Sequence, residues 1–322
     1  MEGRVISLSS VQNVGNKLYY YQVFGIGIES DFALDSLVPC SAETLPLNPI
    51  IVRLGNISAE LTDEPTVDAG WYKFNSKEFY YEIPDVIRFI AANGRSIMVE
   101  PLCDDWQKML LFFYSNAVAA VLLQRGLTPF HVSGVLDKSG KVWLFAGHSK
   151  AGKSTTALML KERGYELFTD DTALLEVING KAMTVASYPM IRVWEKTLEK
   201  QQTFAQKKAF QMRKGINKYG IHFHETFHQE PIEIAGIVFL NNKTESLGVE
   251  PISRLKAFSM LRQNVYRNNW TSKMGLEHKI FNTISGILAK TPAFQAFRPS
   301  DRQSFDEFAL LIEEQIIEKS SN

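Results

Sequence analysis

The chain contains little cysteine and has no net charge. Of its 322 residues only Cys40 and Cys103 are cysteines, too few for a disulfide framework or a cysteine-based zinc site. Its 35 Lys and Arg residues balance 35 Asp and Glu residues, so no chain-wide attraction to nucleic acid or to an anionic membrane is expected. Residues 1–10 have no apolar core of signal-peptide length. We therefore expect a reducing, cytoplasmic setting with neither nucleic-acid nor membrane partners.

The chain also lacks an uncharged run long enough to span a bilayer. Its most apolar segment, Met109–Gln124, is shorter than the roughly 20 residues that a membrane-spanning helix needs. Charged residues flank this segment on both sides, and Ser115–Asn116 interrupts it. The pattern predicts a helix over Asp104–Arg125 that stops at Gly126 and is buried between two domains.

The length and composition are those of an ordinary globular protein with room for two domains. We expect residues 1–126 to form a smaller β-rich domain that ends in this helix. Aromatic and β-branched residues dominate Lys17–Gly25, Ile50–Leu54 and Phe79–Ile83, as is typical of strands. Asn93–Gly94 lies between two further apolar runs and predicts a tight hairpin. The region shows no catalytic constellation.

A glycine-rich loop, residues 147–154, is the most informative stretch of the chain. It has the pattern G-x-x-x-x-G-K-S. An apolar β-type run, residues 142–145, precedes it, and a helical pattern, Thr155–Arg163, follows it. This strand–loop–helix context is the one that a phosphate-binding loop requires. The pattern therefore predicts nucleotide binding.

Each part of this loop has a chemical reason. Gly147 and Gly152 allow the backbone to curl so that successive N–H groups point at phosphate oxygens. The positive end of the following helix favours the same anion. Lys153 can reach the β- and γ-phosphates, and the Ser154 hydroxyl can ligate Mg²⁺. The residues expected to bind the nucleotide, ATP or GTP, are Gly147, His148, Ser149, Lys150, Ala151, Gly152, Lys153, Ser154 and Thr155.

Two adjacent acidic residues, Asp170–Asp171, follow the loop helix and one short predicted strand. Two carboxylates placed together repel each other unless a cation or a proton offsets the repulsion. A metal–phosphate site supplies the cation. One carboxylate can hold Mg²⁺ beside Ser154, and the other can accept the proton of an attacking hydroxyl.

Residues 127–322 mix strands and helices, so we expect an α/β or α+β domain. A hairpin is predicted over 130–136 and 141–146, and strands over 166–169, 173–178, 182–187 and 232–240. Helices are predicted over Lys196–Lys218, Ile252–Val265, Ile280–Leu288 and Phe305–Glu318.

These motifs together resemble the core of the HPr kinase/phosphorylase family. They are His131-x-Ser-Gly, the glycine-rich loop, Arg163–Gly164–Tyr165 and Asp170–Asp171, and the similarity covers about residues 128–195. The resemblance implies a fold related to phosphoenolpyruvate carboxykinase, in residues 127–322, behind the β-rich domain.

The resemblance also implies roles for single residues. Lys153 and Ser154 match the nucleotide- and metal-binding positions. Asp170 matches the proposed catalytic base, Asp171 matches the acid on the metal side, and His131 matches a histidine near the reacting phosphate. The expected catalytic residues are thus Asp170, Lys153 and His131, and the expected metal ligands are Ser154 and Asp171.

One family motif is incomplete in this chain. The Glu-Ile-Arg-Gly motif, whose Glu supports the metal, corresponds to Met190–Ile191–Arg192–Val193. Met190 replaces the acid, and Glu195 is the candidate substitute. We therefore expect kinase activity rather than phosphorolysis or recognition of HPr.

The N-terminal part is similar to HPr-kinase-like proteins encoded beside ribosomal-peptide genes. The similarity rests on the Phe-Gly-Ile-x-Ile-x-Ser stretch at Phe24–Ser30 and the Ile-Pro-x-x-x-Arg-Phe segment at Ile83–Phe89. Some proteins of that kind phosphorylate a serine of a precursor peptide, for example a lasso peptide precursor. The resemblance implies a peptide or small-protein partner that carries a serine.

Three further sets of residues are weaker candidates. The histidines His222, His224 and His228, with Glu225, have spacing that could bind Zn²⁺, but the pattern favours a loop or strand with histidines on one face. The basic run Lys207–Lys218 could guide an acidic peptide or be a solvated helix face. Two arginines, Arg262 and Arg267, have the charge to reach a transferred phosphoryl group.

The sequence therefore predicts an ATP- and Mg²⁺-dependent kinase for a serine hydroxyl of a peptide or small protein. The first alternative is a kinase of the same fold for a small metabolite such as free serine. The second is a nucleotide-binding sensor without phosphotransfer, because Met190 replaces the acid. The acceptor, the choice between ATP and GTP, and the existence of a homo-oligomer are left open.

Overall fold

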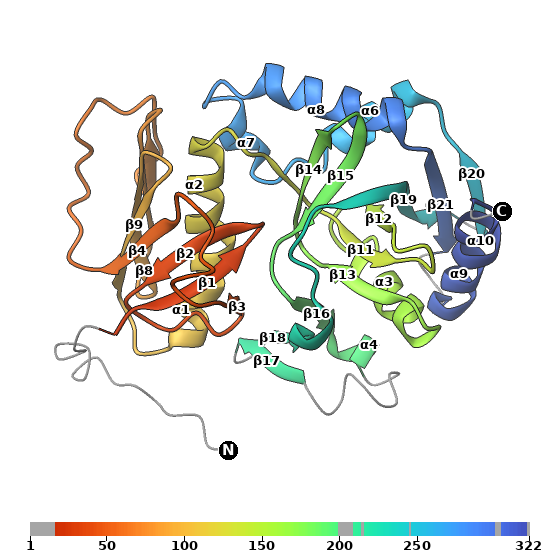
Figure 1. Ribbon diagram of the computed structural model, residues 1–322, viewed down its shortest axis with the longest axis horizontal. Coiled ribbons are helices and arrows are strands. Elements are labelled where there is room, and N and C mark those ends of the chain that lie inside the picture. The colour runs from red at the N-terminus through yellow and green to blue at the C-terminus, as the bar shows by residue number, and fades with distance from the viewer. Residues whose placement is uncertain (1–16, 199–208, 214–215, 245, 300–303, 321–322) are drawn as a thin grey trace.

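The computed structural model describes residues 17–198, 209–213, 216–244, 246–299 and 304–320. Figure 1 shows two bodies, an N-terminal one in red and orange and a C-terminal one in green to blue, with a helix between them. The mixed α/β character expected from the sequence is present, with strands and helices in several sheets.

The N-terminal body is built on one sheet. Its strands are β1 (Tyr19–Val23), β2 (Ile26–Ser30), β3 (Val38–Pro39), β4 (Ile50–Leu54), β5 (Val67–Asp68), β6 (Tyr72–Phe74), β7 (Glu78–Ile83), β8 (Ile87–Ala92) and β9 (Ser96–Pro101). They lie in the order β3-β1-β2-β4-β9-β8-β7-β6-β5. Strand β4 pairs in parallel with β2 and β9, and the other pairs are antiparallel.

The hairpin predicted at Asn93–Gly94 is confirmed. Both residues have positive φ, 54° and 64°, which is the geometry of a two-residue turn whose twist matches that of the strands. Buried and partly buried residues alternate along β8, because successive side chains of a strand point to opposite faces. The strands predicted over 17–25, 50–54 and 79–83 are also present.

The predicted helix between the two bodies is confirmed. It runs through α1 (Trp106–Phe112), a π-helical turn η2 (Phe113–Ala117) and α2 (Val118–Gln124). Gly126 ends it with φ of 70°, and its N–H donates to the carbonyl of Leu123 at 2.8 Å, a left-handed C-terminal cap. Trp106–Gln124 is long and apolar enough to cross a membrane, but its residues are mostly buried in a core shared by both bodies.

The second sheet carries the strands that follow. They are β10 (Pro129–Phe130), β11 (Ser133–Leu136), β12 (Val142–Ala146), β13 (Glu166–Thr169), β14 (Ala173–Ile178), β15 (Lys181–Ala186), β19 (Ile232–Thr244), β20 (Gly248–Pro251) and β21 (Ala293–Pro299). The order is β10-β14-β15-β19-β12-β11-β13, with β21 beside β19 and β20 beside β21. The pairs β12–β19 and β19–β21 are parallel, so the sheet is mixed.

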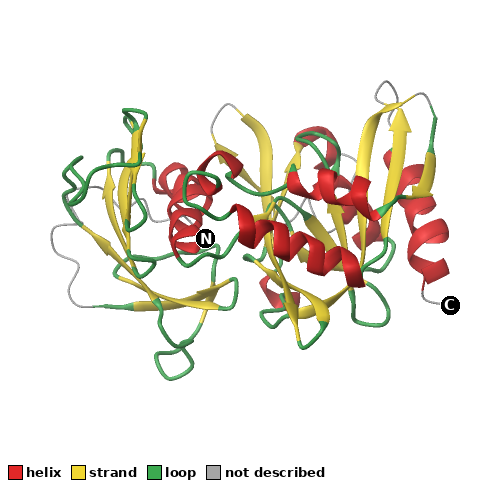
Figure 2. Ribbon diagram, turned by 90° about the horizontal axis from the view of Figure 1, so that it is seen from above, coloured by secondary structure: helices red, strands yellow, loops and turns green. Residues whose placement is uncertain are grey.

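Helices pack along this second sheet (Figure 2). They are α3 (Lys153–Glu162), α6 (Arg254–Arg262), α7 (Asn268–Thr271), α8 (Glu277–Lys290), α9 (Phe305–Ile312), a π-helical turn η4 (Glu313–Ile317) and α10 (Glu318–Ser320). Trp143 and Phe145 of β12 share a core with α3 and α9, whereas Val142 and Leu144 share another with α6 and α8. Because neighbouring strand residues face opposite sides, α3 and α9 cover one face and α6 and α8 cover the other.

A third sheet corrects one prediction. The helix expected over Lys196–Lys218 is wrong: after β16 (Met190–Trp194) and α4 (Glu195–Leu198), the described residues form strands β17 (Ala209–Arg213) and β18 (Ile216–His222), in the order β16-β18-β17. Residues 199–208 and 214–215 lie outside the described part.

The physical reason for this correction is alternation along β17. Phe210 and Met212 pack into the core shared with the N-terminal body, whereas Ala209 packs into the core of α3. A strand can bury side chains on both of its faces, because successive residues point to opposite sides. Tertiary packing of this kind overrides local helix propensity.

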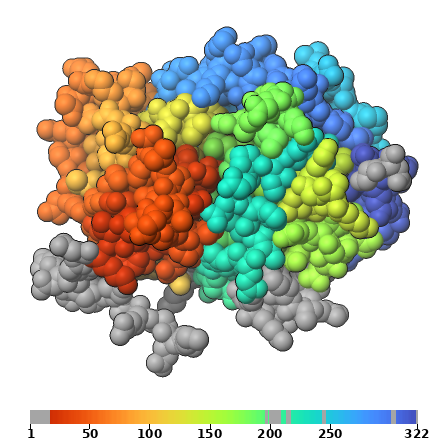
Figure 3. All heavy atoms as spheres, viewed as in Figure 1, coloured from red at the N-terminus to blue at the C-terminus, as the bar shows by residue number. Residues whose placement is uncertain are grey.

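The two bodies meet along a continuous seam, where the red strands touch the cyan segment (Figure 3). His222 and His224 in this segment face the N-terminal body: His222 Nε2 lies 3.2 Å from Ser36 Oγ, and His224 Nε2 lies 3.2 Å from the carbonyl oxygen of Leu37. The turn η3 (His224–Thr226) follows β18.

Candidate active site

The glycine-rich loop joins β12 to α3, in the strand–loop–helix arrangement that the sequence predicted. Gly147 and Gly152 have φ of 147° and 107°, a region that side chains rarely adopt. A Cβ atom on Gly147 would lie 2.8 Å from the carbonyl oxygen of Leu240 in β19. Glycine is therefore required here both by backbone conformation and by the close approach of the neighbouring strand.

Lys153, the first residue of α3, is 6% exposed. Its ammonium group donates to the carbonyl oxygens of Gly147 at 2.8 Å and His148 at 3.3 Å, so it is folded onto the loop. Burial lowers the pKa of Lys153 to about 8, although the nearby Asp170 and Asp171 carboxylates act in the opposite direction. A buried ammonium held by neutral carbonyls alone is placed to exchange them for an anion.

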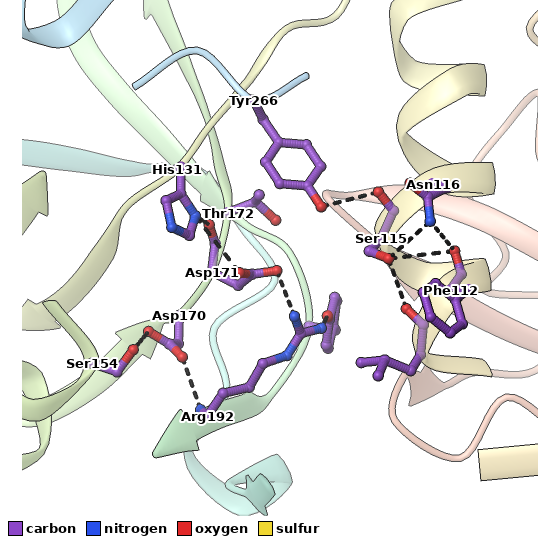
Figure 4. A network of polar contacts seen from close by, with 12 residues as sticks. Phe112, Ser115, Asn116, His131, Ser154, Asp170, Asp171, Thr172, Arg192 and Tyr266 are labelled. Atoms are coloured by element: carbon purple, nitrogen blue, oxygen red, sulfur yellow. Dashed lines mark hydrogen bonds and ion pairs between the residues drawn. The ribbon is translucent and has the colours of Figure 1, made fainter. Parts of the chain in front are cut away.

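Asp170 directly follows β13 and is 2% exposed. Its Oδ1 accepts hydrogen bonds from Ser133 Oγ at 2.5 Å and Ser154 Oγ at 2.8 Å. Its Oδ2 accepts one from the backbone N–H of Arg192 at 2.8 Å (Figure 4). The acid that lies against Ser154 is thus Asp170, whereas the resemblance assigned the metal position to Asp171.

Asp171 lies in a left-handed conformation, with φ of 70°, which turns it away from Asp170. Its Oδ2 accepts a hydrogen bond from Arg192 Nη1 at 2.9 Å, and its Oδ1 lies 3.6 Å from His131 Nδ1. Burial alone would raise the pKa of Asp171, but Arg192 and then His131 outweigh burial and lower it. The Asp171 carboxylate is therefore held ionised between two basic side chains.

His131 lies 2.6 Å, through Nδ1, from the backbone carbonyl oxygen of Asp171 (Figure 4). A carbonyl oxygen can only accept, so Nδ1 carries the hydrogen and Nε2 is left as the acceptor. Burial lowers the pKa of His131, while Asp171 opposes this. The ring is therefore neutral at neutral pH, with the tautomer that a general base needs.

Arg192 of β16 holds the acidic pair together and was not singled out in the sequence. It binds Asp170 through its backbone and Asp171 through its side chain, and it also donates to Tyr188 Oη. The one signal available was its place as the arginine of Met190–Ile191–Arg192–Val193, the segment that corresponds to the Glu-Ile-Arg-Gly motif.

Asn264 was also missed. Its Oδ1 accepts the N–H of Gly147 at 2.9 Å, and its backbone carbonyl accepts the N–H of His131 at 2.6 Å. It is buried between α6 and α7, and its Nδ2 donates to the carbonyl of Met260 at 2.8 Å. Asn264 thus joins the loop, through its side chain, to the segment between β10 and β11 that carries His131, through its backbone carbonyl, and no sequence motif marks it.

These residues surround a cavity of about 360 Å³. It is lined by His131, Ser133, Ser149, Lys150, Gly152, Lys153, Ser154, Thr155, Asp170, Asp171, Arg192, Trp194, Lys218 and Phe305. Nine of them were expected as catalytic, nucleotide-binding or metal residues. Of the other five, Ser133 and Arg192 contact the acidic pair, Trp194 and Phe305 add aromatic walls, and Lys218 adds a cation. Gly147, His148 and Ala151, expected at the nucleotide, belong to the loop but do not line the cavity.

The substitute proposed for the missing family acid lies elsewhere. Met190 lines a separate apolar cavity between the two bodies. Glu195 accepts hydrogen bonds from Asn217 at 2.6 Å and Tyr219 at 3.3 Å. Neither residue lines the cavity at Asp170.

Other candidates point away from the site. Arg262 forms a bidentate pair with Glu277 at 2.8 Å. Arg267 donates to the backbone carbonyl of Ser115 at 3.4 Å and stacks on Tyr266 and Trp270. Neither arginine lines the cavity at Asp170, and a contact with a phosphoryl group stays a prediction.

The histidine set does not form a zinc site in the described residues. His222 and His224 bind the N-terminal body, whereas His228 Nε2 lies 3.3 Å from Glu166. Within the described ranges no three His, Cys, Asp or Glu side chains are grouped to hold a metal. Of the basic run, Lys218 lines the cavity, and Lys207, Lys208 and Lys214 lie outside the described residues.

Two oxygen ligands at the loop suit a Mg²⁺ ion. Ser154 Oγ and Asp170 Oδ1 are 2.8 Å apart, and Mg²⁺ in phosphoryl-transfer enzymes is typically held by one or two protein oxygens together with phosphate oxygens and water. The donor set therefore fits a metal that arrives with the nucleotide.

Comparison with known proteins adds little. No model of a known protein family matches the sequence, and no curated protein matches it. Among solved structures, the Hpr(Ser) kinase/phosphatase from Coxiella burnetii is similar at 12% identity over 59% of this chain and 97% of that chain, with a TM-score of 0.30. At that score the match carries no conclusion about activity.

Proposed function

We propose that this protein is a Mg²⁺- and ATP-dependent kinase that transfers the γ-phosphoryl group to a serine hydroxyl of a peptide or small protein. The single observation that carries the proposal is the contact between Ser154 of the glycine-rich loop and the buried carboxylate of Asp170. A lysine folded onto the same loop and a neutral histidine across the cavity complete the requirements of phosphoryl transfer.

In this proposal the metal-side acid is Asp170 rather than Asp171. Ser154 and Asp170 hold Mg²⁺, which neutralises charge on the phosphate oxygens when it is bound. Loop N–H groups and Lys153 hold the β- and γ-phosphates. Asp171 is already paired with Arg192 and His131, so it orients these residues.

His131 receives the proton of the acceptor in this proposal. The serine oxygen bonds to the γ-phosphorus, the bond from that phosphorus to the β–γ bridging oxygen breaks, ADP leaves, and the proton moves to His131 Nε2. The imidazolium so formed is stabilised by the Asp171 carboxylate 3.6 Å from Nδ1. Transfer otherwise depends on positioning and on electrostatic stabilisation.

The peptide acceptor is the finer part of the proposal. It rests on the resemblance to peptide serine kinases and on a second, apolar cavity of about 200 Å³ between the two bodies. This cavity is lined by Leu110 and Tyr114 from the interbody helix and by Met190 and Phe210 from the third sheet. Met190 is two residues from Arg192, so an apolar side chain of a bound peptide can lie close to the acidic pair.

The test is phosphotransfer measured by intact mass. The wild-type protein with Mg-ATP is offered serine-containing peptides and, in parallel, free serine. The proposal predicts one added phosphoryl group on a peptide, equimolar ADP, and no transfer after chelation of Mg²⁺. Transfer to free serine alone would support the metabolite kinase instead.

The sensor alternative has one observation in its favour: Met190 stands where the family has an acid, and Glu195 does not replace it at the cavity. It predicts ATP binding with no ADP formed for any acceptor. That result would overturn the kinase proposal while leaving nucleotide binding intact.

A further inference from the structure

Arg298, in β21, is a buried cation for which the described residues offer no carboxylate partner. It is 6% exposed, and its one described hydrogen bond runs from Nη1 to the carbonyl of the next residue, Pro299, at 3.3 Å. Its Nε is buried and has no hydrogen-bond partner. In the described part of the chain no Asp or Glu oxygen lies within 4.0 Å of its guanidinium. Such a group costs free energy unless an anion joins it.

The position of Arg298 indicates which anion this is. A Cβ atom placed on Gly152 would lie 3.5 Å from Arg298 Nη2 and 3.7 Å from Nε. The guanidinium therefore lies directly beside the last glycine of the loop, at the positive N-terminus of the ten-residue helix α3. A second cation, Lys153, directly follows Gly152 in the sequence.

Phe305 of α9 packs against this side chain. Its ring centroid lies 4.2 Å from the Arg298 guanidinium carbon, and Phe305 and Gly152 both line the cavity of the candidate active site. A guanidinium holds its donors in one plane, which suits two phosphate oxygens at once. Burial lowers the pKa of Arg298, and no described acid opposes this effect. Arg298, Lys153 and the N-terminus of α3 thus lie together at Gly152, on the wall of the cavity.

We propose that Arg298 binds the polyphosphate tail of the nucleotide together with the glycine-rich loop, although it lies far from that loop in the sequence. The inference rests on the proposed nucleotide binding and extends it to a residue outside every motif. Gly152 then has a second role: the absence of a side chain there lets the guanidinium reach the loop.

The test compares Arg298→Met with wild type, using ATP and inorganic tripolyphosphate as probes. Loss of a charge-assisted contact is expected to weaken both by about 10–100-fold. The ligand-free variant is expected to melt at the same temperature as wild type or higher, because Met removes an unpaired buried charge and keeps the packing on Phe305. Arg254→Met, an exposed arginine of α6, is the matched control and should change neither.

The outcomes separate the alternatives. Unchanged affinity for both probes would overturn the inference and leave nucleotide binding intact. Weaker ATP binding with unchanged tripolyphosphate binding would mean that Arg298 contacts the base, which also contradicts it. If the Met variant does not fold, Arg298→Lys, which keeps the charge but loses the planar fork, should still weaken both probes. Wild-type protein that binds neither probe would overturn the proposed function together with this inference.

Discussion

The two bodies of the molecule bury different kinds of side chain. Up to residue 126 the described part of the chain buries no Asp, Glu, Lys, Arg or His side chain, and its core is aliphatic and aromatic. Beyond that point five such side chains are buried: Lys153, Asp170, Arg192, Arg298 and Glu313. All except Glu313, which pairs with Arg163, lie at or beside the glycine-rich loop.

This difference indicates where stability and function reside. Burial of apolar surface stabilises the fold, whereas buried charge is costly unless it is paired. The N-terminal body is stabilised by aromatic contacts: Phe79 stacks on Phe74 at 4.9 Å, and it also meets the tilted ring of Trp270, from α7 of the C-terminal body, at 4.4 Å. The C-terminal body instead carries an electrostatic cost around one cavity, which is the expected mark of a functional site.

The largest effect should follow from Asp170→Asn. The variant keeps the shape of the side chain but removes the charge opposite Ser154, so the turnover number for phosphotransfer should fall by about 10²–10³-fold. Nucleotide binding without metal should change little. Asp85→Asn, an exposed turn residue of the N-terminal body, is the control. Normal turnover in Asp170→Asn would remove this residue from the mechanism.

Phe79→Ala should destabilise the N-terminal body without affecting the nucleotide site. Phe79 is fully buried, so its removal should lower the free energy of unfolding by about 3–5 kcal/mol, measured by chemical denaturation. The dissociation constant for ATP should stay within about twofold, because the loop lies in the other body. Trp71→Ala, an exposed aromatic of the same body, should cost far less. A loss of ATP affinity in the folded Phe79 variant would show that the bodies are coupled.

His131→Gln should lower kcat/KM by about 10²-fold or more, the usual contribution of a general base. Because burial lowers the pKa of His131 below its ordinary value of 6.5, the wild-type ring is mostly unprotonated at pH 6.5 and above. The wild-type rate should therefore decline only below pH 6.5, and the variant should show no such decline. His278→Gln, an exposed histidine of α8, should keep the wild-type profile; a variant profile identical to wild type would exclude His131 as the base.

The smallest expected effect is the pH dependence of stability that His222 causes where the two bodies meet. Burial, and then His224, lower the pKa of His222 to about 4. Between pH 6.5 and 4 the unfolded chain binds a proton at His222 that the folded chain does not, so stability falls as pH falls through this window. After allowance for the partial exposure of the ring we expect about 1 kcal/mol. Denaturation at pH 7 and pH 5 should show this loss in wild type and a smaller one in His222→Gln; equal losses would place the titration elsewhere.

Local pattern predicted much of the fold. The glycine-rich loop, the Asn93–Gly94 hairpin and the helix ended by Gly126 follow from residues that are neighbours in sequence, and the structure has all three. The helix expected over Lys196–Lys218 failed because strand pairing between β17 and β18 and the two cores around them decide that segment.

The site was predictable only where its chemistry lies within one motif. Asp170 and Asp171 could be named from the sequence. Their separate roles depend on which of them lies against Ser154. That is Asp170, whereas Asp171 adopts a left-handed backbone conformation. Arg192 reaches the acidic pair, and Asn264 and Arg298 reach the loop, from three later parts of the chain. Long-range approach of this kind has no signature in a single sequence.

Everything proposed for this site requires that the cradle at Lys153 bind a nucleoside triphosphate. Calorimetric titration of Mg-ATP into wild-type protein and into Lys153→Met measures this binding. We expect saturable binding at one site in wild type and an affinity at least about tenfold weaker in the variant, with no loss of thermal stability in the absence of ligand. If wild-type protein binds no Mg-ATP, or if the variant binds it as tightly, the cradle does not hold the nucleotide.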